Sequence, residues 1–180
     1  MKRMRGALWP TNWIRFEKEW GRANLDSIRR YPVTPSRPLS VRPLGSVSRE
    51  FYDPATKTLY AAVNYPGEFS YIAAIDVATG TIRKLCELST PALYYVCSLA
   101  YDASSKPLFV STNNSRGYRN LESYSIATGK TKRLIRYSRT GDLAFNRADK
   151  TLWGIQHHNG YSSLVRMPPP YRDGQVIPML

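Results

Sequence analysis

Short apolar runs separated by turn residues dominate the chain after residue 48. In the run 59–63, Leu59, Ala61 and Val63 alternate with Tyr60 and Ala62, so both faces of an extended strand would be apolar. A sheet with one face in water would instead alternate apolar with polar residues. The pattern therefore predicts short strands in sheets that pack against one another on both faces.

Nearly the same nine residues occur three times: YDPATKTLY at 52–60, YDASSKPLF at 101–109 and FNRADKTLW at 145–153. The first two copies align without a gap, and the tripeptide Ala-Thr-Gly recurs at the same offset, at 78–80 and 127–129. A repeat of roughly 40–50 residues is typical of a propeller blade. The second residue of each copy is Asp53, Asp102 or Asn146, residue types that start turns by bonding their own backbone.

The repeat predicts an all-β fold, a partial β-propeller of about three blades. Each blade is a four-stranded antiparallel unit, and the units span 48–96, 97–140 and 141–180. We expect strands at 48–52, 58–64, 70–77 and 80–87, then at 97–101, 107–112, 120–126 and 130–136, and at 142–145 and 151–156 in an incomplete third unit. A propeller closes with about four to eight blades. The arc is therefore a piece of a longer protein or is completed by another chain, and we expect self-association through its open blade faces.

Residues 1–47 are expected to form one N-terminal amphipathic helix and a Pro-rich linker. Trp13, Phe16 and Trp20 fall on one helical stripe. Thr11 or Asn12 would cap the start of the helix, and a proline at 32 bars its continuation. The basic N-terminus is not followed by a continuous apolar stretch, so no signal peptide is predicted. No apolar run is long enough for a transmembrane segment.

The net charge of +13 is uneven, and the first fifty residues carry much of it. Such charge can attract a polyanion, but no nucleic-acid motif accompanies it, so nucleic acid is an unexpected partner. The alternative to protein binding is that a basic outer strand binds a polyanion through Lys130, Lys132, Arg133 and Arg136. Cys86 and Cys97 have no redox or zinc spacing, and the sequence leaves their redox state open.

The repeat resembles the blades of bacterial six-bladed, TolB-like propellers, in which a D-x-x-x-x-x-L-aromatic strand and a D-x-x-T-G hairpin recur. The longer pattern is similar to an envelope-associated bacterial family with a gluzincin-type, peptidase-MA-like zinc metallopeptidase domain before its propeller. That pattern comprises a W-x-x-F-x-x-x-W helix, a P-x-T linker, LGSVSREFYD at 44–53, GDLAFNRADKTLWGI at 141–155 and HHNGYSSLVRMPPPY at 157–171. The resemblance implies an envelope or periplasmic location.

No catalytic set is evident in the sequence. The chain has no H-E-x-x-H motif, and its two histidines, His157 and His158, are adjacent and would diverge in a strand. No general base is evident for Ser162 or Ser163, and there is no phosphate loop. We therefore expect no enzyme activity, cofactor or metal within this chain. If the resemblance holds, the catalytic domain lies outside it.

The loops between the second and third strands of the repeats read NYPGEF at 64–69, NNSRGYRN at 113–120 and HHNGY at 157–161. Because they occupy equivalent places, they should gather on one rim and bind a protein or peptide. The candidate ligand-binding residues are Asn64, Tyr65, Asn113, Asn114, Arg116, Tyr118, His157, His158 and Tyr161. The predicted function is a non-catalytic protein-interaction module that is a fragment of a larger propeller protein. The alternative is the accessory propeller portion of a zinc metallopeptidase.

Overall fold

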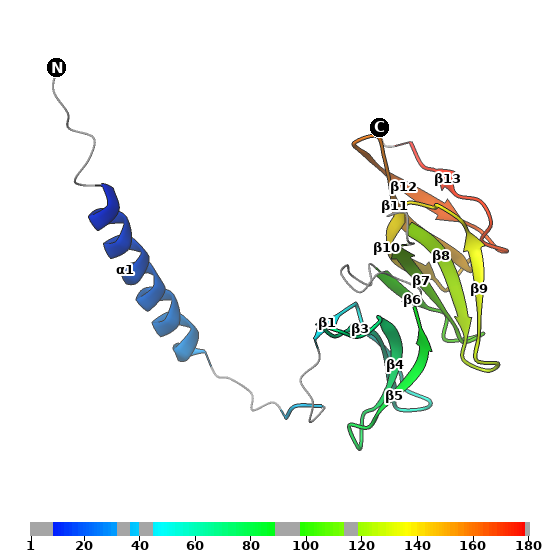
Figure 1. Cartoon of the computed structure of the whole chain (residues 1–180), viewed down its shortest axis with the longest axis horizontal. Helices are drawn as coiled ribbons and strands as arrows, with labels where there is room; N and C mark the ends of the chain where they lie inside the picture. The colour runs from blue at the N-terminus through cyan, green and yellow to red at the C-terminus, as the bar shows by residue number, and fades with distance from the viewer. Residues whose placement is uncertain (1–8, 32–36, 40–44, 89–97, 114–118, 179–180) are drawn as a thin grey trace. The chain divides into compact units, whose positions relative to one another are not determined.

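The computed structural model describes residues 9–31, 37–39, 45–88, 98–113 and 119–178. The chain divides into two compact units, Met1–Pro38 and Leu39–Leu180. The described part of the first unit contains the helix α1 (Trp9–Arg30), and that of the second contains three antiparallel sheets (Figure 1). No helix within the described ranges is long and apolar enough to cross a membrane.

The helix α1 begins two residues before the predicted cap. It starts at Trp9, so the expectation that Thr11 or Asn12 caps it is wrong. Pro10 lies in its first turn, where a missing N–H costs nothing because that group has no partner inside the helix. The helix ends at Arg30, with Arg29 and Arg30 in the last turn, where positive charge is favoured by the helix dipole.

The aromatic stripe of α1 is exposed in the described structure. Trp13, Phe16 and Trp20 are 58%, 56% and 62% exposed, and the Trp13 and Phe16 rings lie 5.8 Å apart. The stripe that the sequence predicts is therefore present on the helix surface.

Replacing Gly21 by alanine is expected to stabilise α1 by about 1 kcal/mol, because glycine in a helix interior loses more backbone freedom than alanine. A Cβ at Gly21 meets no atom within 4 Å. The helical signal in circular dichroism should therefore melt at a higher temperature. The matched control is Gly154→Ala in the third sheet, where a Cβ would lie 2.9 Å from the Gly141 carbonyl oxygen and should destabilise the sheet. A Gly21→Ala helix that melts earlier would contradict the expectation.

The first sheet contains β1 (Ser46–Val47), β2 (Phe51–Asp53), β3 (Thr58–Asn64), β4 (Tyr71–Asp76) and β5 (Ile82–Glu87). The second sheet contains β6 (Ser98–Tyr101), β7 (Pro107–Asn113), β8 (Arg119–Ser125) and β9 (Lys130–Ile135). The third sheet contains β10 (Thr140–Asn146), β11 (Thr151–His158), β12 (Tyr161–Met167) and β13 (Gln175–Val176). Neighbouring strands are antiparallel, and β1 and β2 both pair with β3, so together they form the inner strand of the first sheet. The third sheet also has four strands, so the prediction that it is incomplete is wrong. Its last strand is only two residues long.

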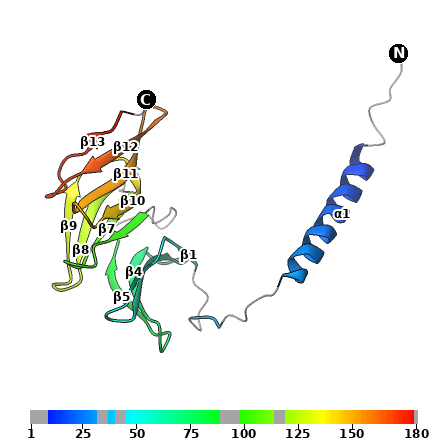
Figure 2. The same ribbon diagram turned by 180° about the vertical axis from the view of Figure 1, so that it is seen from behind.

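The second sheet lies between the other two, and both of its faces are buried (Figure 1, Figure 2). Toward the first sheet, Leu108 and Val110 pack with Tyr60 and Ile72. Toward the third sheet, Phe109 of β7 packs with side chains of three strands. They are Leu143 of β10, Leu152 of β11, and Val165 and Met167 of β12. The Leu-aromatic pairs of the repeat are thus largely core residues, as their apolar pattern predicts.

The first sheet also buries the face that points away from the second sheet. Ala61, Val63, Ala73 and Ile75 are at most 1% exposed on that side. The apolar face expected to be open at this end of the arc is therefore covered. In the third sheet, Trp153 and its neighbours on the corresponding face are half-buried. Self-association through open blade faces stays a prediction.

Cys86 is a half-buried free thiol that packs beside the core between the first and second sheets. Burial raises the pKa of this thiol, which keeps it protonated at neutral pH. Cys97 lies outside the described residues.

The nine-residue repeat forms the turn and second strand of each sheet. The side chain that opens each turn accepts a 3.0 Å hydrogen bond from the backbone N–H two residues later. The lysine that closes each turn has a left-handed backbone, with φ of 51°, 59° and 58°. The opening residues are Asp53, Asp102 and Asn146, and the closing residues are Lys57, Lys106 and Lys150. One local structure written three times therefore explains the repeat.

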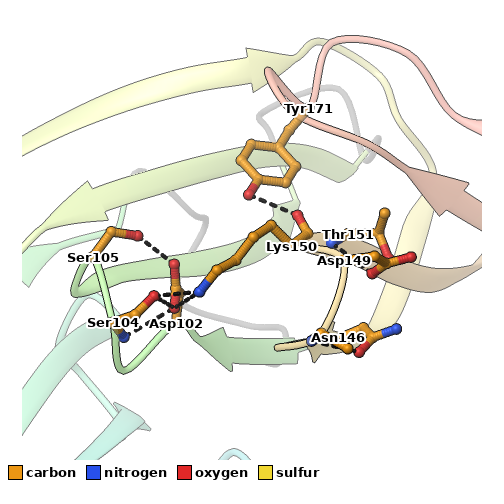
Figure 3. A network of polar contacts seen from close by, with 9 residues as sticks. Asp102, Ser104, Ser105, Asn146, Asp149, Lys150, Thr151 and Tyr171 are labelled. Atoms are coloured by element: carbon orange, nitrogen blue, oxygen red, sulfur yellow. Dashed lines mark hydrogen bonds and ion pairs between the residues drawn. The ribbon is translucent and has the colours of Figure 1, made fainter.

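These turns also connect neighbouring sheets, as Figure 3 shows for the second and third. Lys150 Nζ lies 3.6 Å from Asp102 Oδ1 and donates a hydrogen bond to Ser104 Oγ. Between the first and second sheets, the Tyr101 hydroxyl donates a 3.0 Å hydrogen bond to Asp53 Oδ2. Burial opposes ionisation of both aspartates, but hydrogen bonds and the charge of a lysine from the next sheet hold their pKa values below the ordinary value.

Candidate functional site

The three loops predicted to form a rim each follow the second strand of a sheet, so they lie at the end opposite to the repeat turns. They are the β3–β4 loop (65–70), the β7–β8 loop (114–118) and the β11–β12 turn (159–160). We call these three loops the rim. Asn114, Arg116 and Tyr118, which belong to the second loop, lie outside the described residues, as does the side chain of Asn113.

The first rim loop places its predicted residues mainly in the interior. Tyr65 is only 5% exposed, and its ring stacks on that of Tyr71 at 6.5 Å. Asn64, the last residue of β3, is half-buried. Phe69 is 57% exposed instead, although the candidate residues do not include it. The exposed aromatic side chain of this loop is therefore Phe69, and Tyr65 serves as a packing residue.

The β11–β12 hairpin, whose turn is the third rim loop, presents its predicted residues to solvent. His157 and His158 are exposed, and Tyr161 is 77% exposed. The two histidines are consecutive residues of β11, so their side chains point to opposite faces of the sheet. That arrangement disfavours joint metal binding, and the described residues contain no group of three metal-ligating side chains.

His157 is paired with a serine, a contact that sequence reasoning missed. Its Nδ1 lies 3.0 Å from Ser162 Oγ across the β11–β12 pair. A catalytic serine also requires a group that orients the histidine and donors that stabilise an oxyanion. Among the described residues, no carboxylate forms an ion pair or hydrogen bond with His157. We therefore interpret the pair as a surface hydrogen bond.

Residues 136–139, which we call the crossing segment, lead from the second sheet to the third at the rim end. The Asn120 side chain accepts a 3.1 Å hydrogen bond from Tyr137 N, and Gln156 Nε2 donates a 3.0 Å bond to Ser138 O. The backbone of Arg139 bonds both sheets: its N–H donates to Arg119 O at 3.3 Å, and its carbonyl accepts from His157 N at 3.1 Å. The crossing segment thus ties β8 to β11 and brings their rim ends side by side.

Arg136 belongs to the crossing segment, so the prediction that it lies on the basic outer strand is wrong. The strand β9 ends at Ile135, so Arg136 does not lie on the basic outer strand with Lys130 and Lys132. Its guanidinium donates a 2.9 Å hydrogen bond to the Tyr137 hydroxyl and lies 4.7 Å from the centre of that ring. The outer strand nevertheless keeps three exposed basic residues, Lys130, Lys132 and Arg133.

A pocket of about 360 Å³ lies at the opposite end of the first sheet and is lined in part by Asp76 and Arg83. The Asp76 carboxylate accepts hydrogen bonds from Ala78 N at 2.9 Å and Thr79 N at 2.8 Å. These bonds hold its pKa below the ordinary value. Asp76 is therefore engaged in its own turn, as the Thr-Gly hairpin pattern predicts, and we do not treat this pocket as the site.

Three stacked antiparallel sheets of four strands each, with β1 and β2 counted as one inner strand, define the chain as a partial β-propeller. No family model matches the chain. No curated protein matches it either.

Comparison with solved structures identifies the propeller type. TolB from Acinetobacter baumannii superposes with a TM-score of 0.57 at 13% identity, over 74% of this chain and 32% of that one. A nidogen/laminin complex matches with a TM-score of 0.57 at 8% identity, over 72% and 47%. A puromycin hydrolase variant matches with a TM-score of 0.52 at 14% identity, over 72% and 20%. The fold is that of a TolB-like partial propeller, and the chain spans less than half the length of each of these structures.

Proposed function

We propose that this chain is a non-catalytic module that binds a protein or peptide across the rim. The observation that carries the proposal is the exposure of large side chains at the rim of separate sheets. Phe69, in the first rim loop, is 57% exposed, and Tyr161, directly after the third, is 77% exposed. Aromatic side chains that a rigid scaffold holds in solvent are typical anchors of protein interfaces. A propeller also occurs among the chains of a nidogen/laminin complex, which supports a role in protein association.

The loops that carry these side chains are held on a fixed frame. Tyr65 and Tyr71 fix the base of the first loop through their stacked rings. His158 and Tyr161 pair at the end of the β11–β12 hairpin. Little conformational entropy is then lost when a partner binds, which favours affinity.

The test is a selection of displayed random peptides against the full chain, followed by affinity measurements. Replacing Phe69 and Tyr161 together by alanine should weaken the selected peptides about tenfold or more, since each is a large exposed anchor. The matched control replaces Tyr52 and Val77, which are 49% and 39% exposed at the opposite end of the first sheet. If no peptide is enriched, or if both double variants weaken binding equally, the rim is not the binding site.

A further inference from the structure

A guanidinium group crosses from the second sheet onto the inner strand of the third. Arg119 is the first residue of β8, and its Nη1 occupies the space that a Cβ on Gly141 would fill. Gly141 is a buried residue of β10, the inner strand. The absence of a side chain at this position is therefore what lets the Arg119 guanidinium lie against the backbone of the next sheet.

Two more arginines lie at the same end of these sheets. Arg139 is bonded through its backbone to Arg119 and His157, as described above, and Arg136 is stacked on Tyr137. Between the second and third sheets, the rim end therefore carries three guanidinium groups together with the exposed His157 and Tyr161.

Acidic groups are scarce at this end. Within the described residues of the crossing segment and of the strand ends that it joins, the one carboxylate is that of the exposed Asp142. Nor does any Asp or Glu of the described ranges form an ion pair with Arg119. The guanidinium of Arg119 is therefore available to pair with a carboxylate that a binding partner supplies.

We propose that Arg119, Arg136 and Arg139 recognise the carboxylates of an acidic peptide segment, and that the Arg119 guanidinium is held in one orientation for this contact. The inference rests on the proposed protein-binding function and names its class of partner. A guanidinium can hold a carboxylate through two parallel hydrogen bonds. This geometry forms only when the plane of the guanidinium faces the carboxylate in one orientation. Gly141 supplies that orientation for Arg119. The exposed Tyr161 lies on the β11–β12 hairpin, which the backbone of His157 bonds to Arg139, so it offers an aromatic contact at the same end of the sheets.

A nucleic acid is the competing partner, and it fits this end less well. Phosphate backbones bind through repeated, loosely oriented charges along a line. The exposed Lys130, Lys132 and Arg133 of β9 provide such a line. Arg119, Arg136 and Arg139 differ from this line because the Arg119 guanidinium is half-buried and lies against Gly141.

The experiment measures the fluorescence anisotropy of a labelled octaglutamate peptide with the full chain at low salt, beside octaglutamine and oligothymidine of the same length. Arg119→Gln should weaken octaglutamate about fivefold or more, as expected when one charged partner is removed. Gly141→Ala leaves the net charge unchanged but displaces the guanidinium, so it should weaken octaglutamate about threefold or more. The control variant, Lys130→Gln with Lys132→Gln, should change the affinity by less than about twofold.

Thermal unfolding of each variant checks that it is folded, and Arg119→Lys provides a milder change that keeps the charge but removes the guanidinium. The inference is overturned if Gly141→Ala binds octaglutamate as the wild type does, or if the control variant loses as much as Arg119→Gln. Tighter binding of oligothymidine than of octaglutamate, with the loss confined to the β9 variant, would assign the charge to nucleic acid. If selected neutral peptides bind through Phe69 and Tyr161 while octaglutamate does not bind, the acidic partner is wrong and the proposed function stands.

Discussion

Replacing Phe109 by alanine is expected to lower the free energy of unfolding of the propeller unit by about 3–5 kcal/mol. Phe109 is 1% exposed, and its ring lies 5.7 Å from Phe145 and 4.8 Å from Tyr171. Its loss would open a cavity between the second and third sheets, because Phe145 belongs to β10 and Tyr171 to the connection between β12 and β13. Urea unfolding followed by tryptophan fluorescence measures the change.

The matched control is Phe69→Ala, the same substitution at an exposed rim position. It should change stability by less than about 0.5 kcal/mol, as is usual for surface sites. Equal losses in the two variants would show that the second and third sheets do not share the core described here.

Replacing Asp102 by alanine should destabilise the propeller unit by about 2–3 kcal/mol, because several buried hydrogen bonds are lost together. Asp102 is 3% exposed and accepts hydrogen bonds from Ser104 N at 3.0 Å, from Ser104 Oγ at 2.6 Å and from Ser105 Oγ. It also faces Lys150 of the third sheet. The control is Asn146→Ala, since Asn146 opens the equivalent turn but is exposed, and its loss should cost less than about 1 kcal/mol. Equal losses of stability in the two variants would show that the contact of Asp102 with Lys150 does not stabilise the propeller.

The same carboxylate predicts how stability depends on pH. The pKa of Asp102 in the folded chain lies below its ordinary value of 3.8, so the unfolded chain binds the proton more readily. The contribution of Asp102 is therefore fully present well above pH 3.8 and is lost as the pH falls through the lowered folded pKa. In acid titrations of stability, Asp102→Ala should show a shallower loss than the wild type. An unchanged slope would indicate that Asp102 does not favour the folded state through its charge.

Features that depend on local chemistry could be predicted from the sequence. The second strand of the first sheet is predicted at 58–64 and observed as Thr58–Asn64, because a turn residue on each side fixes its ends. The fourth strand of the second sheet, predicted at 130–136, is observed as Lys130–Ile135. The third and fourth strands of the third sheet could not be predicted, since VRMPPPY does not repeat the earlier pattern and β13 is very short.

The candidate site was harder to predict because it depends on contacts between sheets. Whether Tyr65 or Phe69 faces solvent depends on where Tyr71 lies in the next strand. The contact of Arg119 with Gly141 joins residues of different sheets, and no spacing in the sequence reports it. The TGD triplet at 140–142 offers a faint signal, since a glycine inside a strand often marks a close approach. His157, His158 and Tyr161 were accessible to prediction because a hairpin turn exposes its flanking residues.

The lysine of each turn suggests a rule for building longer arrays from these units. A further blade added after the third must contain a lysine with a left-handed backbone at the end of its turn. This lysine must contact a carboxylate of the preceding blade, as Lys150 contacts Asp102. The last unit here would offer Asn146, which carries no charge. Asn146→Asp is therefore the change to combine with any grafted fourth unit.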